Sequence, residues 1–179
     1  MQSQLPALLL DAATSIGTDI GSAQQGDVMS ESDGFISEPD PENPGWFTWR
    51  LLDDRRYNAQ VLGKMLVRSE GEERARLRMF PTIKHSNLGN NLHGGTTLGF
   101  IDVALFGAAR MFGLIEAGTA VTLDLSTQFL GSGAVDIPLD AEVELLRETK
   151  RLLFLRGLVV QGDNRIAAFA GTIRKPTAQ

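Results

Sequence analysis

The stretch that decides the fold runs from Thr96 to Leu114 and reads TTLGFIDVALFGAARMFGL. Its apolar residues occur on every side of a helical projection, and Asp102 and Arg110 are its only charged residues. A helix that is apolar all round has to be covered by other parts of a folded protein. The sequence therefore predicts a buried helix at the centre of the fold.

Segments that read as strands stand on both sides of this helix. Before it, the mostly apolar run 57–67 and the alternating run 74–83 are separated by residues 69–72, Ser-Glu-Gly-Glu, which predicts a hairpin. After it, four segments with a period of two are separated by short turn sequences: 119–130, 139–147, 152–161 and 165–174. Two strands, one buried helix and four strands predict an α+β fold, with an antiparallel sheet wrapped around a long central helix.

The first 45 residues differ in character from the rest of the chain. Leu5 to about Ile16 can place its apolar residues on one side of a short helix, which the polar stretch Gly21 to Ser32 would end. Ser37 to Gly45 contains three prolines, which remove backbone donors and fix φ. We expect an N-terminal extension over 1–45, a short helix plus an irregular segment, and one folded domain over 46–179.

The bulk composition excludes several classes of protein. A chain of 179 residues that is 42% hydrophobic and 22% charged is typical of a single domain with a sizeable core. It has no cysteine and two histidines, eight residues apart, so we expect no disulfide, no metal site and no other cofactor. The formal net charge of −5 argues against binding to nucleic acid.

The sequence also argues against membrane insertion and secretion. No run approaches the roughly 20 apolar residues that a membrane helix needs. The short apolar stretch near the start has no basic residues before it and is followed at once by Asp11, unlike a signal peptide. We expect a cytoplasmic protein.

The residues that carry chemistry precede the central helix and lie within it. Residues 87–95 read NLGNNLHGG. Gly94 and Gly95, entering the helix, would leave backbone N–H groups unshielded at its positive end, where an oxyanion can approach, although the pair can also serve only a tight turn. If Asp102 is buried on this apolar helix, its charge has a desolvation cost that hydrogen bonds must offset or a raised pKa must relieve, and either suits a general base. The alternative is that Asp102 lies at a solvated edge of the helix.

The spacing of these residues predicts a dimer. Nine residues separate His93 from Asp102, which is roughly 13 Å along a helix with a rise of 1.5 Å per residue, too far for both to act on one carbonyl group. If they cooperate, a second copy of the helix runs alongside in the opposite sense, as two-fold symmetry would place it. This predicts a homodimer with two sites.

These residues resemble the pattern of hotdog-fold thioesterases of the PaaI type. The pattern consists of Asn87, the triplet 93–95, Asp102 and the strand sequence 122–130, and the likeness covers roughly residues 62–175. Its most specific part is an Asn six residues before His-Gly-Gly and an Asp nine residues after that His. The resemblance implies a single hotdog fold that hydrolyses an acyl-CoA thioester to free acid and CoA. It leaves homodimer and homotetramer both open.

The resemblance also implies a role for each residue of the pattern. The backbone N–H of Gly94 would polarise the thioester carbonyl, while Asp102 of the partner subunit activates water or attacks directly; both mechanisms stay open. Asn87 would help to hold the water or attacking group, and His93 would lie beside the thioester. Thr122, or a neighbour such as Ser126, would orient the water.

Further residues are candidates for binding the substrate. Gly95 lies beside Gly94, and Arg147, Lys150 and Arg151 cluster at a turn between two late strands, where the family often contacts the CoA phosphates; the alternative is a solvated turn. The aromatic residues Trp46, Phe47 and Trp49 either line an acyl pocket or cover the core. His85 is expected to be a surface or packing residue.

Two other functions compete with hydrolysis. A non-catalytic hotdog module could bind acyl-CoA without turning it over, but the presence of Asp102 argues against it. A hotdog dehydratase acting on 3-hydroxyacyl thioesters would use a catalytic His with an acid in a different arrangement, which His93 within His-Gly-Gly fits poorly.

Overall fold

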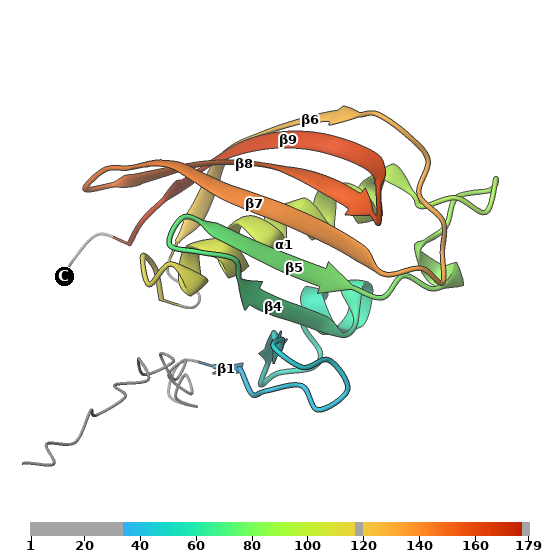
Figure 1. Ribbon diagram of the computed structural model, residues 1–179, viewed down its shortest axis with the longest axis horizontal. Helices are drawn as coiled ribbons and strands as arrows, with labels where there is room; N and C mark the ends of the chain where they lie inside the picture. Colours follow the sequence, from blue (N-terminus) through green and yellow to red (C-terminus); the bar gives the residue numbers. More distant parts are fainter. Residues whose placement is uncertain (1–33, 117–119, 177–179) are drawn as a thin grey trace, which may run out of the picture.

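The computed structural model describes residues 34–116 and 120–176 of the chain (Figure 1). The helix expected over Leu5 to Ile16 lies outside the described residues, as does the polar stretch that follows it. Within the described ranges, no helix is both long and apolar enough to cross a membrane.

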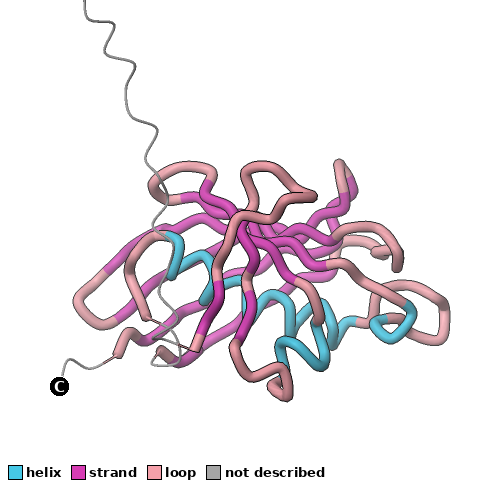
Figure 2. Tube along the Cα trace, turned by 90° about the horizontal axis from the view of Figure 1, so that it is seen from below, coloured by secondary structure: helices cyan, strands magenta, loops and turns pink. Residues whose placement is uncertain are grey.

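One long helix, α1 (Gly94–Met111), lies in the curve of a seven-stranded antiparallel sheet (Figure 1, Figure 2). Most helix residues from Phe100 onward are buried. The strands follow the order β2-β4-β5-β7-β8-β9-β6 across the sheet. The predicted α+β fold, with a sheet wrapped around a central helix, is confirmed.

The elements have the following bounds. The strands of the large sheet are β2 (Phe47–Thr48), β4 (Met65–Ser69), β5 (Arg74–Met79), β6 (Val121–Phe129), β7 (Leu139–Glu148), β8 (Leu152–Gln161) and β9 (Asn164–Arg174). A separate two-stranded sheet pairs β1 (Phe35–Ile36) with β3 (Arg50–Leu51). Two short helices are η2 (Asn58–Leu62), a π-helix, and η3 (Ile83–His85), a 3-10 helix.

The long periodic segments fold as predicted. The helix expected over 96–114 occupies 94–111, and each of the four strands expected after it is present. The predicted hairpin before the helix is the antiparallel pair β4 and β5. Sustained periodicity therefore located the main elements to within a few residues.

The prediction for residues 57–67 was wrong in its first half. Asn58–Leu62 form η2, and the strand begins only at Met65. Between them, Gly63 has a φ of 79°, and its N–H donates to the carbonyl of Asn58 at 2.9 Å. A positive φ favours glycine, so Gly63 ends the helical turn and redirects the chain into β4.

The connection after β6 is not the simple turn that the sequence suggested. β6 pairs with β9, whereas β7 pairs with β5 and β8. Residues 130–138 therefore cross from one edge of the sheet toward its middle, and the carbonyl of Gly133 accepts a hydrogen bond of 2.7 Å from the N–H of Leu92. This crossover leaves β6 with one unpaired edge in the single chain.

The helix packs closely on the sheet at glycines. A Cβ at Gly107 of α1 would clash with the side chain of Leu77 in β5, and a Cβ at Gly171 of β9 would clash with Leu105 of the helix. Leu77 and Leu105 are fully buried. Burying one such leucine contributes roughly 1.5–3 kcal/mol, so this close approach holds α1 against the sheet.

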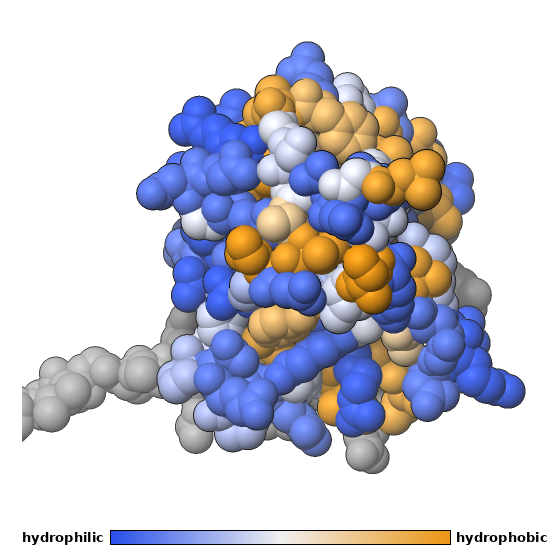
Figure 3. All heavy atoms as spheres, turned by 90° about the vertical axis from the view of Figure 1, so that its right-hand side faces the viewer, coloured by the Kyte–Doolittle hydropathy of each residue, from blue (hydrophilic) through white to orange (hydrophobic). Residues whose placement is uncertain are grey.

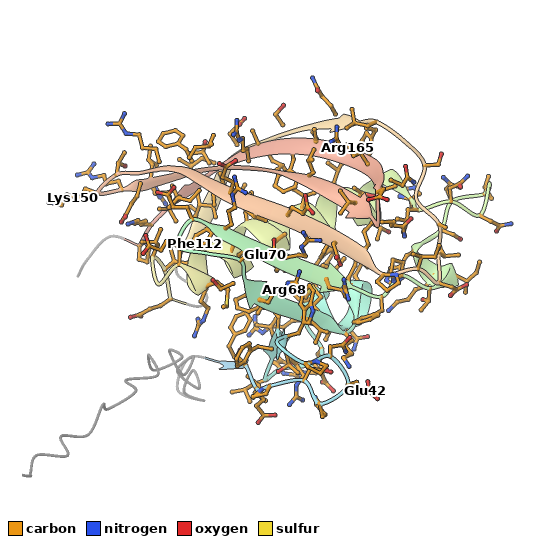
Figure 4. All side chains as sticks on the ribbon, in the orientation of Figure 1. Glu42, Arg68, Glu70, Phe112, Lys150 and Arg165 are labelled. Carbon is orange, nitrogen blue, oxygen red and sulfur yellow. The ribbon has the colours of Figure 1, made fainter. Side chains whose placement is uncertain are left out.

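The other face of the sheet is charged. Arg78 makes two hydrogen bonds to the buried carboxylate of Asp140, of 2.6 and 2.7 Å. The ring of Trp46 lies between the guanidinium groups of Arg68 and Arg78, at 4.6 and 4.5 Å from its centroid. Arg68 also pairs with Glu70, and both are labelled in Figure 4. Trp46 thus covers the sheet on the side away from α1.

Candidate active site

The start of α1 presents a free backbone donor at Gly94. His93 is the N-cap: its backbone is extended, and its Nδ1 accepts a hydrogen bond of 2.9 Å from the N–H of Gly95. Within the described part of the chain, the N–H of Gly94 has no hydrogen-bond partner. The ring of the exposed Phe129 lies beside Gly94, where a Cβ would be 3.3 Å from Cζ. Of the two predicted glycines, only Gly94 thus has a free N–H to stabilise an oxyanion.

Asn87 shapes the loop that leads into this helix. Its Oδ1 accepts hydrogen bonds from the N–H groups of Gly89 at 2.8 Å and Asn91 at 3.2 Å. The loop turns at Asn90, whose φ is 58°. The side-chain nitrogen of Asn87 has no partner among the described residues, so it can donate to a bound molecule.

Asp102 lies in the middle of α1 and is held by Thr122. The Thr122 hydroxyl donates to Oδ1 of Asp102 at 2.7 Å, and both residues are half-buried. The pairing of β6 with β9 is irregular between Thr122 and Asp124, and such bulges re-aim side chains. The hydrogen bond orients the carboxylate, and Oδ2 has no hydrogen-bond partner within the described residues.

The candidate residues form two separate groups in one chain. Asn87, His93, Gly94 and Gly95 lie at the start of α1, whereas Asp102 lies two turns further along the helix, about 12 Å from Gly94 at 1.5 Å per residue. The structure therefore brings Thr122 to Asp102, and it leaves both away from the free N–H of Gly94.

A cavity of about 250 Å³ lies beside Asp102. Three aromatic side chains line it: Phe35, Trp49 and Phe106. The rings of Phe35 and Trp49 are 4.3 Å apart at an angle of 44°. Arg110 and Glu116 also line it, so its aromatic side suits an apolar group bound next to the carboxylate.

The aromatic residues after the proline-rich segment have different positions. Trp49 is 3% exposed and both packs in the core and lines the cavity beside Asp102. Trp46 lies on the far face of the sheet, and Phe47 is half-buried against the core. Both alternatives, pocket and core, thus apply to Trp49, core packing applies to Phe47, and Trp46 packs outside the core cluster.

The predicted basic cluster is exposed. Arg147, Lys150 and Arg151 lie at the turn between β7 and β8, and Figure 4 shows Lys150 at its tip. No side-chain hydrogen bond or ion pair is present for the three within the described residues. Leu152, just after this turn, pairs with Arg174 of β9. On its other side, Arg174 pairs with Val121 at the start of β6. The cluster therefore lies toward the end of the sheet where β6, the strand of Thr122, begins.

Several residues near the site were not predicted. Phe35 and Asn58 line the cavity, and the ring of Tyr57 lies over Gly99, one helical turn before Asp102. Their strands and turns are too short to show a period, so no pattern in the sequence could place them there. His85 is the packing residue expected: it is 2% exposed, its Nε2 is 2.7 Å from the carbonyl oxygen of Val61, and its Nδ1 accepts from Thr82 N–H at 2.8 Å.

Comparison with protein families gives one match. Residues 89–168 match the family model of the thioesterase superfamily, a range that begins in the loop before α1 and ends in β9. The structure also resembles many solved structures. This match and the shared fold support a hotdog-fold thioesterase.

Three solved structures illustrate the similarity. The PaaI protein from the phenylacetic acid degradation operon of E. coli is 25% identical, with a TM-score of 0.57 over 65% of this chain and 86% of that one. Thioesterase superfamily member 2 from Mus musculus is 20% identical, with a TM-score of 0.55 over 64% of this chain and 84% of that one. A hypothetical thioesterase from Streptococcus pneumoniae TIGR4, solved with coenzyme A, is 16% identical, with a TM-score of 0.55 over 63% of this chain and 88% of that one.

A search of the curated proteins found no match. The likeness to the thioesterase superfamily therefore rests on the matched range and on these shared folds. At these identities, the roles of individual residues in this hotdog protein depend on its own geometry.

Proposed function

We propose that the protein is a homodimeric thioesterase that hydrolyses acyl-CoA to free acid and CoA. Each site would take Asp102 and Thr122 from one chain and Asn87, His93 and Gly94 from the other. The observation that carries the proposal is the Asp102 carboxylate, held at 2.7 Å by Thr122 at the edge of a cavity that three aromatic side chains help to line. The match to the thioesterase superfamily supports the reaction type, and the similar fold solved with coenzyme A supports the substrate class.

The free edge of β6 supports the dimer. This strand of nine residues has one unpaired side and exposes Val121, Leu123 and Phe129 at 41%, 54% and 55%. A long apolar edge strand is a template for pairing with another chain. Figure 3 views the end of the molecule where α1 begins, and apolar patches lie there among polar atoms.

Pairing of two β6 strands would complete the site. Thr122, near the start of β6, contacts Asp102, and Phe129, at its end, lies beside Gly94. Two antiparallel copies related by a two-fold axis near the middle of β6 would place Thr122 beside Phe129 of the partner subunit. Asp102 would then approach Gly94 of the partner subunit, which one chain cannot achieve.

The chemistry follows from these positions. The free N–H of Gly94 donates to the thioester oxygen as negative charge develops there. Asp102 either takes a proton from water, whose oxygen adds to the carbonyl carbon, or adds directly and forms an anhydride that water then cleaves. In both routes the C–S bond breaks and the CoA thiolate leaves, taking a proton to become the thiol. The free amide nitrogen of Asn87 can hold the water or the attacking carboxylate.

The remaining predicted residues would bind the CoA moiety. Arg147, Lys150 and Arg151 are exposed cations that can pair with its phosphates. Gly95 contributes through its small size, because its N–H is already bonded to His93 and a Cβ would lie 3.0 Å from that Nδ1.

The test is thiol release from a panel of acyl-CoAs by wild-type protein and the Asp102→Asn variant. We expect turnover of at least one member and a fall in kcat of roughly 10²–10⁴-fold in the variant. Asp163→Asn, an exposed turn residue between β8 and β9, is the matched control and should retain activity.

Other outcomes identify the competing functions. Acyl-CoA binding without thiol release by wild-type protein would indicate a binding module. Conversion of a 3-hydroxyacyl-CoA to the enoyl thioester would indicate a dehydratase. Full activity of Asp102→Asn would refute the assigned role of Asp102.

A further inference from the structure

The cavity beside Asp102 has a second cavity behind it. The first has a volume of about 250 Å³ and the second about 410 Å³. Three residues line both: Trp49, Leu51 and Asn58. The second cavity extends away from α1 toward Lys64 and Met65 at the start of β4. These three shared residues therefore form the wall between the two spaces.

We propose that Trp49, with Leu51 beside it, is the far wall of the acyl pocket and limits the substrate to compact acyl groups. This proposal rests on the proposed thioesterase function. An acyl group whose carbonyl lies at Asp102 enters the first cavity, because the aromatic rings beside this carboxylate line it. A dry cavity of about 150 Å³ is known to hold benzene, so 250 Å³ suits an aryl-acyl group or a short chain of similar size.

The wall is held in place from several directions. The ring of Trp49 packs 4.3 Å from that of Phe35, and the backbone N–H of Trp49 donates to the carbonyl of Met65 at 2.9 Å. Leu51 pairs with Phe35 across the small sheet of β1 and β3. A wall fixed by ring packing and strand pairing cannot give way to a longer acyl chain without losing these contacts.

The side chain of Trp49 can be replaced without breaking a hydrogen bond. Its Nε1–H is buried and has no hydrogen-bond partner within the described residues. Trp49→Phe therefore keeps an aromatic ring in the wall and breaks no hydrogen bond. Trp49→Leu shortens the side chain and joins the two cavities.

The experiment measures kcat/KM for thiol release with a series of acyl-CoAs. The series comprises butyryl-, hexanoyl-, decanoyl-, palmitoyl-, benzoyl- and phenylacetyl-CoA. For wild-type protein we expect the highest kcat/KM with hexanoyl-CoA or an aryl-acyl member. In Trp49→Leu the ratio of kcat/KM for decanoyl-CoA to that for hexanoyl-CoA should rise about 10-fold or more, because each methylene accommodated in an apolar pocket has an effect of that order. Trp49→Phe should keep the wild-type ratio.

Leu51→Ala is a second variant that tests the same wall. Leu51 is half-buried and forms the same wall, so this variant should shift the ratio in the same direction if Trp49→Leu does not fold. Wild-type protein that hydrolyses palmitoyl-CoA as well as hexanoyl-CoA would overturn the proposal, as would an unchanged ratio in a folded Trp49→Leu variant. Absence of thiol release from every member would instead refute the thioesterase function itself.

Discussion

The two ends of the candidate site are built in opposite ways. At the start of α1, Asn87 and His93 bond to backbone N–H groups two to four residues away, and the loop is exposed. In the middle of the helix, Asp102 is half-buried and bonds to Thr122, 20 residues away, beside a cavity whose walls include residues before position 60. The first end is a local motif, and the second exists only because distant segments meet. Substitutions at each end should therefore differ in size and kind.

The largest effect beyond Asp102 itself is expected from removing the free donor at the local end. Gly94 is the first helical residue, where proline is tolerated, and His93 before it has the extended backbone that a following proline requires. Gly94→Pro should therefore keep the fold and lower kcat by about 10²–10³-fold, the usual effect of losing one oxyanion donor. Thiol release measures kcat, and thermal melting followed by circular dichroism checks that the fold is kept. Gly94→Ala, which retains the N–H, is the control.

Mixing Gly94→Pro with Asp102→Asn tests whether the two ends of the site come from different chains. Random reassembly at equal concentrations makes half of the dimers mixed, and each mixed dimer contains one intact site. Activity should recover to about a quarter of the wild-type value. A mixture as inactive as its components would show that both ends act within one chain.

A smaller effect is expected at the long-range end when the support of the carboxylate is removed. Thr122→Val deletes the hydroxyl that orients Asp102 and should lower kcat by roughly 10-fold, the size of one hydrogen bond to a charged group. Thr122→Ser retains the hydroxyl and should keep most of the activity. Equal losses in both variants would show that the methyl group, and not the hydrogen bond, is what matters.

At the local end, loss of the helix cap should affect stability. His93→Ala leaves the N–H of Gly95 without its acceptor and should lower the free energy of unfolding by about 1 kcal/mol. His93→Asn supplies another capping oxygen and should restore most of it. Urea unfolding of the three proteins measures the difference. An unchanged midpoint in His93→Ala would mean that solvent replaces the cap at no cost.

The smallest effect is expected on stability at low pH, from an ion pair in the segment that precedes the cavity-lining residues Trp49 and Leu51. The ammonium of Lys64 and the amide of Asn43 bond to Asp40 and lower the pKa of this carboxyl from 3.8 to about 2. A lowered pKa stabilises the folded state above the unfolded pKa, and this contribution is lost as the pH falls from about 4 toward 2. The difference in melting temperature between wild type and Asp40→Asn should therefore be present at pH 5 and shrink toward pH 2. A difference independent of pH would exclude this ion pair as its source.

The same division explains how much of the protein could be predicted. The helix was located because nineteen residues share one pattern, and the four later strands because each alternates over nine or more residues. β1, β2 and β3 have two residues each, too few for any period, and the turn at Gly63 depends on a backbone angle that an apolar run does not reveal. The predicted boundary at residue 45 remains a prediction, although Phe35 of the extension packs in the core.

Sequence by itself determined the local part of the candidate site. Asn87 and His93 are placed by hydrogen bonds within a single loop, which leads into Gly94, and the nine-residue spacing to Asp102 predicts a second chain if the two ends cooperate. Only the tertiary structure decided that Thr122 holds Asp102 and that Phe35 and Trp49 wall the cavity beside it. The physical reason is that these contacts join residues far apart in the chain, and they depend on sheet order and on the bulge in β6, which no local pattern encodes.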